Sequence, residues 1–332
     1  MKLKSFVAGI ALAASLTSTA SQAETVLKLG TVAPLSSPWG QWAQGVADQI
    51  AEMSGGELKI EVIGDAQLGD EQTILRQGMK GRVDLVMVSN IPLSLIGQEL
   101  DLVSSPFLYD STEQGSCVAF NHLSEILGPS LQDSGLEPLT WMEVGNYLVF
   151  SQEPARTPDA LEGQKVRVAA TTADELFARR LGAVGVPMGT SDTIPALQTG
   201  NVKAAFLPGV FGIAIGTHKV APHVTVSNHT RLIGTVAVSG RSYKKLSDQE
   251  KEWLSAFTEG GTGLSATILG AETALLGQLE GAGVPVAHLT DEEAAAWRAA
   301  SDGLREELAE QLGPKAVSIL EQIEAAKQAC GS

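Results

Sequence analysis

Arg167 is the residue of this chain best suited to bind a small anion. It lies in the segment KVRV, which has the β-branched character of a short strand. A guanidinium presents a planar fork of N–H donors that matches a carboxylate, and such charge-assisted bonds strengthen where water is excluded. Taken alone, the residue could also be an exposed strand arginine, or one paired with Glu162 or Asp192.

Catalytic and metal-binding patterns are missing from the sequence. It contains no G-x-S-x-G nucleophile elbow, no H-E-x-x-H and no GxxxxGK[ST] phosphate loop. The histidines of the turn-rich segment 218–229 lack the i, i+4 spacing of a helical metal site. Asp70 and Glu71 are better explained as favourable charge at a helix N-terminus. We therefore predict no enzyme activity, no metal and no cofactor.

The glycines of GGTGLSA, among them Gly261 and Gly263, give only a fragment of a dinucleotide-binding fingerprint. No strand with the required spacing leads into them. We interpret this cluster as an interruption of a helix.

Cys117 and Cys330 are the only cysteines. In an exported protein an even pair is compatible with one disulfide, which would join the C-terminal tail to the first half of the chain. The alternative is two unpaired thiols, with Cys117 filling a core position. Their spacing excludes a CxxC redox or metal site.

The N-terminus predicts export to the periplasm. Lys2 and Lys4 precede an apolar run over residues 6–16, and Ser21-Gln22-Ala23 forms a small-x-small cleavage site, so residues 1–23 read as a signal peptide cleaved after Ala23. The run is shorter than the roughly 20 residues of a membrane span. Removing both lysines takes the net charge from −15 to −17, a charge that repels nucleic acid and anionic membranes.

Strands and helices alternate from residue 26 onward. VLKLGTV and LKIEVI read as strands on either side of a helix that begins near Trp39, and VDLVMV is a third, buried strand. After Gly145 the pattern restarts with YLVFS, KVRV and NVKAAFL, and the chain becomes largely helical after residue 247. The order predicts an α/β protein with two α/β units, joined by crossing strands in a hinged receptor.

Three segments between Leu161 and Pro208, LEGQKVRV, GVPMG and ALQTGNVKAAFLPG, resemble the second-domain signature of the extracytoplasmic solute receptors of TRAP transporters. The first half, with SPWGQWAQGVADQIAEMSGGELKIEVI and QLGDEQTILRQGMKGRVDLVMVS, follows the same family order. The resemblance covers about residues 26–270. It implies a type II periplasmic-binding protein fold: lobe I from residues 24–145 plus about 233–272, lobe II from 146–232 plus about 273–332, and a ligand cleft between them.

The resemblance implies that Arg167 makes a two-pronged salt bridge to a ligand carboxylate. Where many sialic-acid and dicarboxylate receptors carry a second arginine, this chain has Tyr147, flanked by Asn146. Where the family commonly has a run of polar residues, in the strand that ends before Pro208, this chain has apolar residues that include Phe206 and Leu207. One arginine among apolar walls favours a monocarboxylate or 2-oxo acid with an apolar body, since a second carboxylate would be buried without a partner.

The remaining candidates lie where predicted strands end. Trp39 and Ser37 begin the first helix, at the edge where α/β sheets bind ligands, although Trp39 could equally anchor the core. Ser89 and Asn90 follow the VDLVMV strand, where ordinary turn chemistry is the alternative. We also expect a contribution to the pocket floor from Pro208 and Phe211, near a Pro-Gly turn that needs no ligand to explain it.

These observations predict a periplasmic receptor that closes on a small carboxylate and delivers it to the membrane permease subunits of a TRAP transporter. We expect a monomer. The alternatives are a receptor for a neutral or lipid-like hydrophobic ligand, in which Arg167 is structural, a secreted enzyme with unrecognised catalytic residues, and a sensor subunit that passes its ligand state to a signalling partner.

Overall fold

The computed structural model describes residues 24–331, so the predicted signal peptide and its cleavage site lie outside the described residues. Ten strands occur in this part of the chain: β1 (Thr25–Thr31), β2 (Leu58–Ile63), β3 (Leu85–Ser89), β4 (Leu136–Ser151), β5 (Lys165–Val168), β6 (Val184–Pro187), β7 (Ala204–Pro208), β8 (His223–Val226), β9 (Arg231–Ser239) and β10 (Val286–His288).

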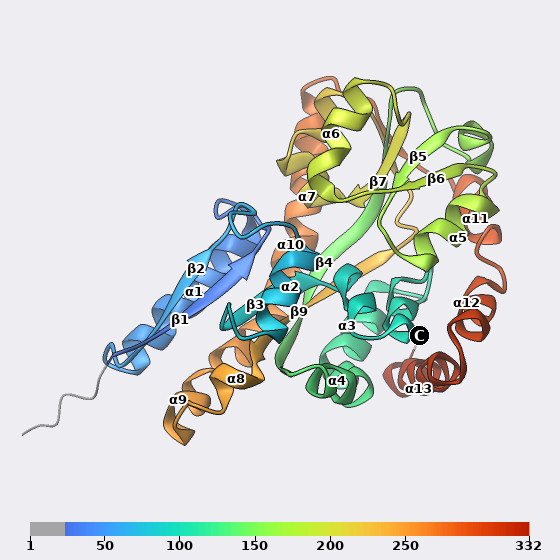
Figure 1. The fold of residues 1–332 in the computed structure, drawn as a ribbon. Helices are drawn as coiled ribbons and strands as arrows, with labels where there is room; N and C mark the ends of the chain where they lie inside the picture. Colours follow the sequence, from blue (N-terminus) through green and yellow to red (C-terminus); the bar gives the residue numbers. More distant parts are fainter. Residues whose placement is uncertain (1–23, 332) are drawn as a thin grey trace, which may run out of the picture.

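The helices that flank the strands are α1 (Pro38–Met53), α2 (Glu71–Met79), α3 (Thr112–Asn121), α4 (Leu123–Asp133), α5 (Thr172–Arg180), α6 (Thr190–Gln198), α7 (Gly209–Ala214), α8 (Gly240–Tyr243), α9 (Asp248–Trp253), α10 (Ala256–Gly281), α11 (Asp291–Ala299), α12 (Leu304–Leu312) and α13 (Pro314–Cys330). Short 3₁₀ turns are η1 (Ile91–Leu95), η2 (Gln98–Ser104), η3 (Pro158–Leu161) and η4 (Thr217–Lys219). The mixed α/β architecture predicted from the sequence is confirmed (Figure 1).

The first part of the sheet has the strand order β2-β1-β3-β9-β4. β1 runs parallel to β2 and β3, as the β-α-β-α-β pattern predicts, and β9 returns antiparallel to β3. Helix α1 begins with Pro38 behind the N-cap Ser37, whose side chain accepts a hydrogen bond from the Gly40 N–H. Its apolar face packs on these strands and completes one core.

The second part has the order β4-β7-β5-β6, with β8 and β10 attached at the side of β4. β5 runs parallel to β6 and β7, while β7 runs antiparallel to β4. The KVRV segment is thus an interior strand, buried from its second residue onward.

β4 is the element that joins the two parts. It pairs with β9 from Leu136 to Asn146 and with β7 from Tyr147 to Ser151, so the predicted strand YLVFS is the second half of one 16-residue strand. Its register shifts twice, near Thr140 and near Gly145, and such bulges bend and twist a strand. Figure 1 shows β4 passing from one part into the other. The lobe boundaries given above stay a prediction.

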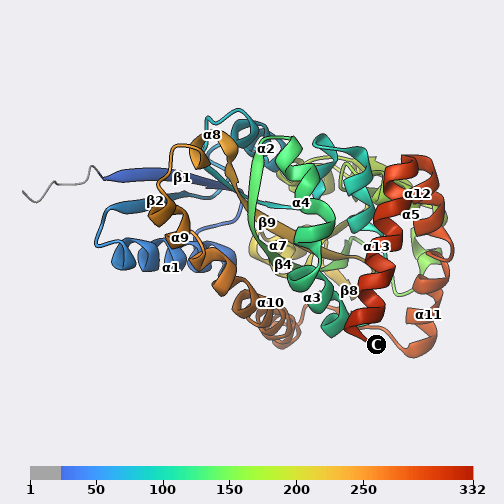
Figure 2. The ribbon, with the colours of Figure 1, turned by 90° about the horizontal axis from the view of Figure 1, so that it is seen from below.

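The three C-terminal helices wrap around the outside of the molecule. α12 contacts α5 and η2, whereas α13 contacts α3, α4 and η2 (Figure 2). The C-terminal segment therefore touches elements from both predicted lobes. No helix among residues 24–331 is long and apolar enough to cross a membrane.

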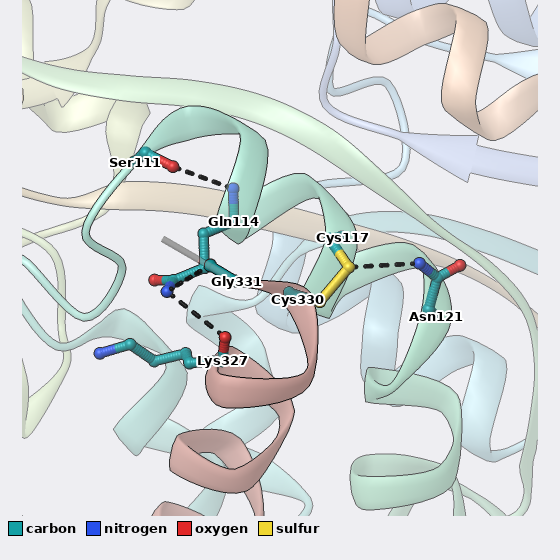
Figure 3. The surroundings of a disulfide bond; sticks show 7 residues. All are labelled: Ser111, Gln114, Cys117, Asn121, Lys327, Cys330 and Gly331. Atoms are coloured by element: carbon teal, nitrogen blue, oxygen red, sulfur yellow. Dashed lines mark hydrogen bonds between the residues drawn. A yellow bond between two sulfur atoms is a disulfide. The ribbon is translucent and has the colours of Figure 1, made fainter.

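A disulfide joins the end of α13 to α3. The sulfur atoms of Cys117 and Cys330 lie 2.04 Å apart, and 213 positions separate them in the sequence. Beside the bridge, the Gln114 side-chain amide donates to the Gly331 carbonyl over 3.0 Å (Figure 3). The tail of the chain is thus held against its first half.

The expected helix interruption at Gly261 and Gly263 is wrong, because α10 continues from Ala256 to Gly281 without a break. The reason is close packing. A Cβ at Gly261 would lie 2.7 Å from Thr140 Oγ1 and 3.0 Å from the Trp141 carbonyl oxygen, whereas a Cβ at Gly263 would meet nothing within 4 Å. Gly261 lets the helix approach β4, and Gly263 is an exposed helical glycine.

These two glycines give a matched pair of variants. Gly261→Ala should lower the free energy of unfolding by about 1–3 kcal/mol, because the added methyl group meets β4 backbone. Gly263→Ala should raise it by up to about 1 kcal/mol, since alanine is the better helix former. Urea unfolding of both variants measures the difference, and equal effects would contradict this account of α10.

Candidate functional site

A cavity of about 60 Å³ lies where the two parts of the sheet meet. The carboxyl ends of β1, β3 and β7 open into it, and ligands of α/β sheets bind at such ends. Most of its wall is apolar. The residues that line it are Thr31, Val32, Ala33, Trp39, Glu71, Met87, Val88, Ser89, Ile91, Met142, Val144, Tyr147, Arg167, Thr190, Leu207, Pro208, Phe211 and Leu232.

Arg167 extends into this cavity from β5 and is only 2% exposed. Its Nη1 donates to the Phe206 carbonyl over 2.8 Å and its Nη2 to the Met188 carbonyl over 3.0 Å. These two bonds fix the plane of the guanidinium, which carries five N–H donors. The Nε–H and one N–H on each terminal nitrogen remain for another acceptor.

No ion pair formed among residues 24–331 involves Arg167. The pairing with Glu162 or Asp192 considered above therefore does not occur, and the side chain is not exposed either. A buried charge without a paired counter-ion is costly. An anion beside Arg167 would remove this cost.

Glu71 is a residue of this cavity that sequence reasoning missed. Asp70 is the N-cap of α2 and accepts from the Thr73 N–H over 2.8 Å, as helix-terminal charge should. Glu71, the next residue, makes different contacts. Its carboxylate accepts hydrogen bonds from the Ser89 N–H (2.6 Å) and the Ser89 hydroxyl (2.7 Å) at the end of β3. The one available signal was its place in the first turn of a helix that faces a strand end.

Desolvation raises the pKa of Glu71 above its usual value. The bonds from Ser89 and the charge of Arg167 act in the opposite direction, and their effects are smaller. The cavity thus combines one guanidinium with one carboxyl group whose proton is held more tightly than usual.

Tyr147 is fully buried and lines the cavity from β4. Its hydroxyl has no hydrogen-bond partner in the described part of the chain, and burial raises its pKa well above the usual value. At neutral pH it is therefore a protonated O–H group. Trp39 is fixed by a bond from its Nε1 to the Glu143 carbonyl (2.9 Å), so its ring both packs in the core and forms part of the wall.

Ser89, Leu207, Pro208 and Phe211 also lie in the wall, as the sequence suggested. The hydroxyl of Ser89 is already bonded to Glu71, so it acts on the cavity by orienting that carboxylate. Leu207 and Phe211 supply apolar surface.

Four predicted residues do not line this cavity. The hydroxyl of Ser37 caps α1 and donates to the Pro34 carbonyl. The amide of Asn90 donates to Ser104 Oγ, so it serves the chain turn after β3.

The other two, Phe206 and Asn146, contact other parts of the molecule. Phe206 packs against Phe177 and His229 in the core, and only its carbonyl oxygen reaches Arg167. Asn146 precedes Tyr147 on β4 and lines a different cavity.

Comparison with known proteins agrees with this architecture. A family model described as bacterial extracellular solute-binding protein, family 7 (DctP) matches residues 29–312. The chain is 25% identical to the C4-dicarboxylate-binding periplasmic protein DctP of Rhodobacter capsulatus over 321 residues, which cover 96% of each chain. It is 26% identical to the sialic acid-binding periplasmic protein SiaP of Vibrio cholerae over 308 residues, which cover 90% of this chain and 92% of that one.

Among solved structures, the sugar acid binding protein DctPAm of Advenella mimigardefordensis, in complex with galactonate, superposes with a TM-score of 0.86. Its sequence identity is 22%, and the match covers 92% of this chain and 99% of that one. The fold is therefore that of the TRAP periplasmic binding proteins, whose family consists of solute-binding receptors. The family model covers most of the chain, and the chain belongs to family 7 of the bacterial extracellular solute-binding proteins, the TRAP transporter receptors.

Proposed function

We propose that this protein is the periplasmic receptor of a TRAP transporter and binds a small organic acid through Arg167. The observation that carries the proposal is the guanidinium itself, which is buried, fixed by two carbonyl oxygens and not ion-paired within residues 24–331. A carboxylate placed against its remaining N–H groups would supply the missing charge with two-pronged geometry.

Walls from both parts of the sheet surround this position. β1, β3 and α2 contribute one side, and β5, β7 and α7 the other. Binding would therefore close the molecule around the ligand, with β4 and β9 as the connecting strands. Closure excludes water, which strengthens the bond between the carboxylate and Arg167.

The cavity fits a ligand with a single carboxylate. A second carboxylate would find no second cation in the wall and would lie in the same small space as Glu71. The free hydroxyl of Tyr147 can donate to a keto or hydroxyl oxygen beside the carboxylate, and the remaining wall is apolar. These features favour a 2-oxo or 2-hydroxy monocarboxylate with a short apolar body.

The periplasmic location and the transport partners follow from family membership and from the predicted signal peptide. In this proposal residues 1–23 are removed after Ala23, and the mature receptor is a monomer that delivers its ligand to the membrane permease subunits. It performs no chemistry on the ligand.

A calorimetric and thermal-shift screen tests the function directly. Pyruvate, 2-oxobutyrate and lactate form the expected class, with succinate, galactonate and the neutral amide of lactate as comparisons. A saturating ligand at one hundred times its dissociation constant should stabilise the protein by about 2.7 kcal/mol. Preference for the neutral amide would replace the proposal by the hydrophobic-ligand alternative, and turnover of a bound compound would replace it by an enzyme.

Glu71 should couple ligand binding to proton uptake. A carboxylate bound at Arg167 adds negative charge near Glu71, so its pKa, already raised by burial, should rise further on binding. Between the pKa values of the free and bound forms, binding takes up a proton, and affinity therefore increases as the pH falls through that window. Below the window Glu71 is protonated in both forms and the affinity is constant.

Titration calorimetry in buffers of different ionisation enthalpy measures the number of protons taken up on ligand binding. The variant Glu71→Gln is expected to take up none and to show the high affinity of the low-pH form at every pH from 5.5 to 8. Asp70→Asn removes a neighbouring carboxylate that does not line the cavity. Because the charge of Asp70 helps to raise the pKa of Glu71, this variant should still take up a proton, with its pH window moved to lower pH. Proton uptake that persists in Glu71→Gln would show that another group titrates.

A further inference from the structure

The two ends of the candidate cavity differ in chemistry. One end holds Arg167, Glu71 and Tyr147. The charge of Arg167 opposes the rise in pKa of both other groups, so the three side chains lie near one another. The other end is apolar. Its side chains belong to, or pack against, a single hydrophobic core that does not include Tyr147: Ala33, Trp39, Met87, Met142, Val144 and Phe211.

Phe211 differs from the other large side chains of this apolar end. Trp39, Met87 and Met142 are buried core residues. Phe211 is half-buried and comes from α7, a helix of only six residues. It packs against two cores at once, that of the first part of the sheet and that around β7. Shortening Phe211 therefore lengthens the cavity without emptying a fully buried core position.

The volume of the cavity limits the size of a ligand. A water-sized group needs roughly 10–15 Å³, so a cavity of about 60 Å³ accommodates about four to six such groups. Pyruvate and lactate lie at the upper end of that range, whereas succinate and galactonate exceed it. With its carboxylate at Arg167, a ligand of this size would extend toward the apolar end and meet Phe211.

We propose that Phe211 determines the chain length of the acid that this receptor accepts, and that the ligand is a 2-oxo or 2-hydroxy acid of about three carbons. The ring closes the apolar end, so a longer chain has no room between Phe211 and a carboxylate at Arg167. This inference rests on the proposed function, because it takes the ligand carboxylate to lie at Arg167. Overfilling a packed site lowers affinity, whereas a methylene group that has room to be buried raises it.

A series of 2-oxo acids of increasing chain length tests this inference. Titration calorimetry compares pyruvate, 2-oxobutyrate and 2-oxohexanoate. In the wild type, affinity should fall by about tenfold or more from pyruvate to 2-oxohexanoate, because the longer chain overfills the cavity. In Phe211→Ala the order should reverse, with a gain of about threefold to fourfold for each methylene group that becomes buried. Phe211→Leu removes less of the side chain and should lie between the two.

Phe120→Ala is the matched control, since Phe120 is also half-buried and does not line the cavity. It should keep the wild-type order of affinities. Arg167→Ala should lose every acid of the series, whatever its length. Circular dichroism confirms that each variant is folded before it is compared. If Phe211→Ala does not fold, Phe211→Leu and Phe211→Trp replace it, and the added bulk of tryptophan should weaken 2-oxobutyrate more than pyruvate.

The outcomes separate the role of Phe211 from the proposed function. If the wild type binds no organic acid, both are overturned. If the wild type binds 2-oxohexanoate as well as pyruvate or better, or if Phe211→Ala keeps the wild-type order, the role of Phe211 is overturned while binding of an acid at Arg167 stands. A reversed order in Phe120→Ala as well would also overturn it, because the change would then not be specific to the cavity wall.

Discussion

Replacing Arg167 by alanine should abolish binding of organic acids and leave the protein folded. Truncating one partner of a buried, hydrogen-bonded charge pair costs about 2–5 kcal/mol, which corresponds to a loss of roughly 30-fold to several thousand-fold in affinity. The alanine variant leaves the Phe206 and Met188 carbonyl oxygens without their donor. It breaks no ion pair within residues 24–331, so the fold should tolerate the change.

Arg167→Lys separates charge from geometry. Lysine keeps the positive charge, but it cannot form two parallel bonds to a carboxylate while bonded to the Phe206 and Met188 carbonyls. We expect an affinity between those of the wild type and the alanine variant. Calorimetry with the best acid from the screen measures all three, and Arg179→Ala is the exposed control. Unchanged affinity in Arg167→Ala would show that Arg167 does not bind the ligand carboxylate.

The sequence singled out Arg167, the cation that lines the cavity, but not Glu71, the carboxylate that lines it too. Arg167 could be found because its strand belongs to a family pattern and because guanidinium chemistry matches a carboxylate. Glu71 was interpreted as helix-terminal charge, which holds for Asp70. Only the packing of α2 against the end of β3 turns the Glu71 carboxylate toward Ser89 and the cavity. Such a contact depends on residues 18 positions apart and leaves no local pattern.

Long-range packing explains a second difference. The sequence placed Asn146 and Tyr147 together in one pocket, but they line different cavities. On β7, Leu207 lines the candidate cavity, whereas Phe206 packs in the core against Phe177 and His229. The strands themselves were predictable from their β-branched runs, whereas the face that each residue presents depends on register, which long-range pairing sets.

Two glycines of α10 show that local sequence patterns do not predict tertiary contacts in a helix either. The sequence offers Gly261 and Gly263 with equal helix-breaking tendency, yet the contacts differ completely, and α10 is continuous through both. Local propensity is a weak guide where tertiary packing decides. Composition and periodicity therefore predicted the type and order of the elements, and the contacts between elements determined the site.

Loss of the Cys117–Cys330 bridge should produce the largest change in stability. The bridge closes a loop of 213 positions, and a loop of that length restricts the unfolded chain strongly. In the chain-entropy model the stabilisation is about 5.4 kcal/mol, slightly above the range of about 2–5 kcal/mol seen when native disulfides are removed. The double variant Cys117→Ala/Cys330→Ala should therefore unfold at a clearly lower urea concentration than the oxidised wild type.

Removing both cysteines together avoids leaving a reactive thiol, and the wild type treated with a reductant should unfold like the double variant.

Ligand affinity is the informative second measurement. Neither cysteine lines the ligand cavity, so an effect that acts through the unfolded chain should lower stability without changing the dissociation constant. A matching loss of affinity would instead mean that α13, held against α3 by the bridge, determines the shape of the binding site. Unchanged stability would mean that packing of α13 on α3, α4 and η2 already restrains the tail without the covalent bond.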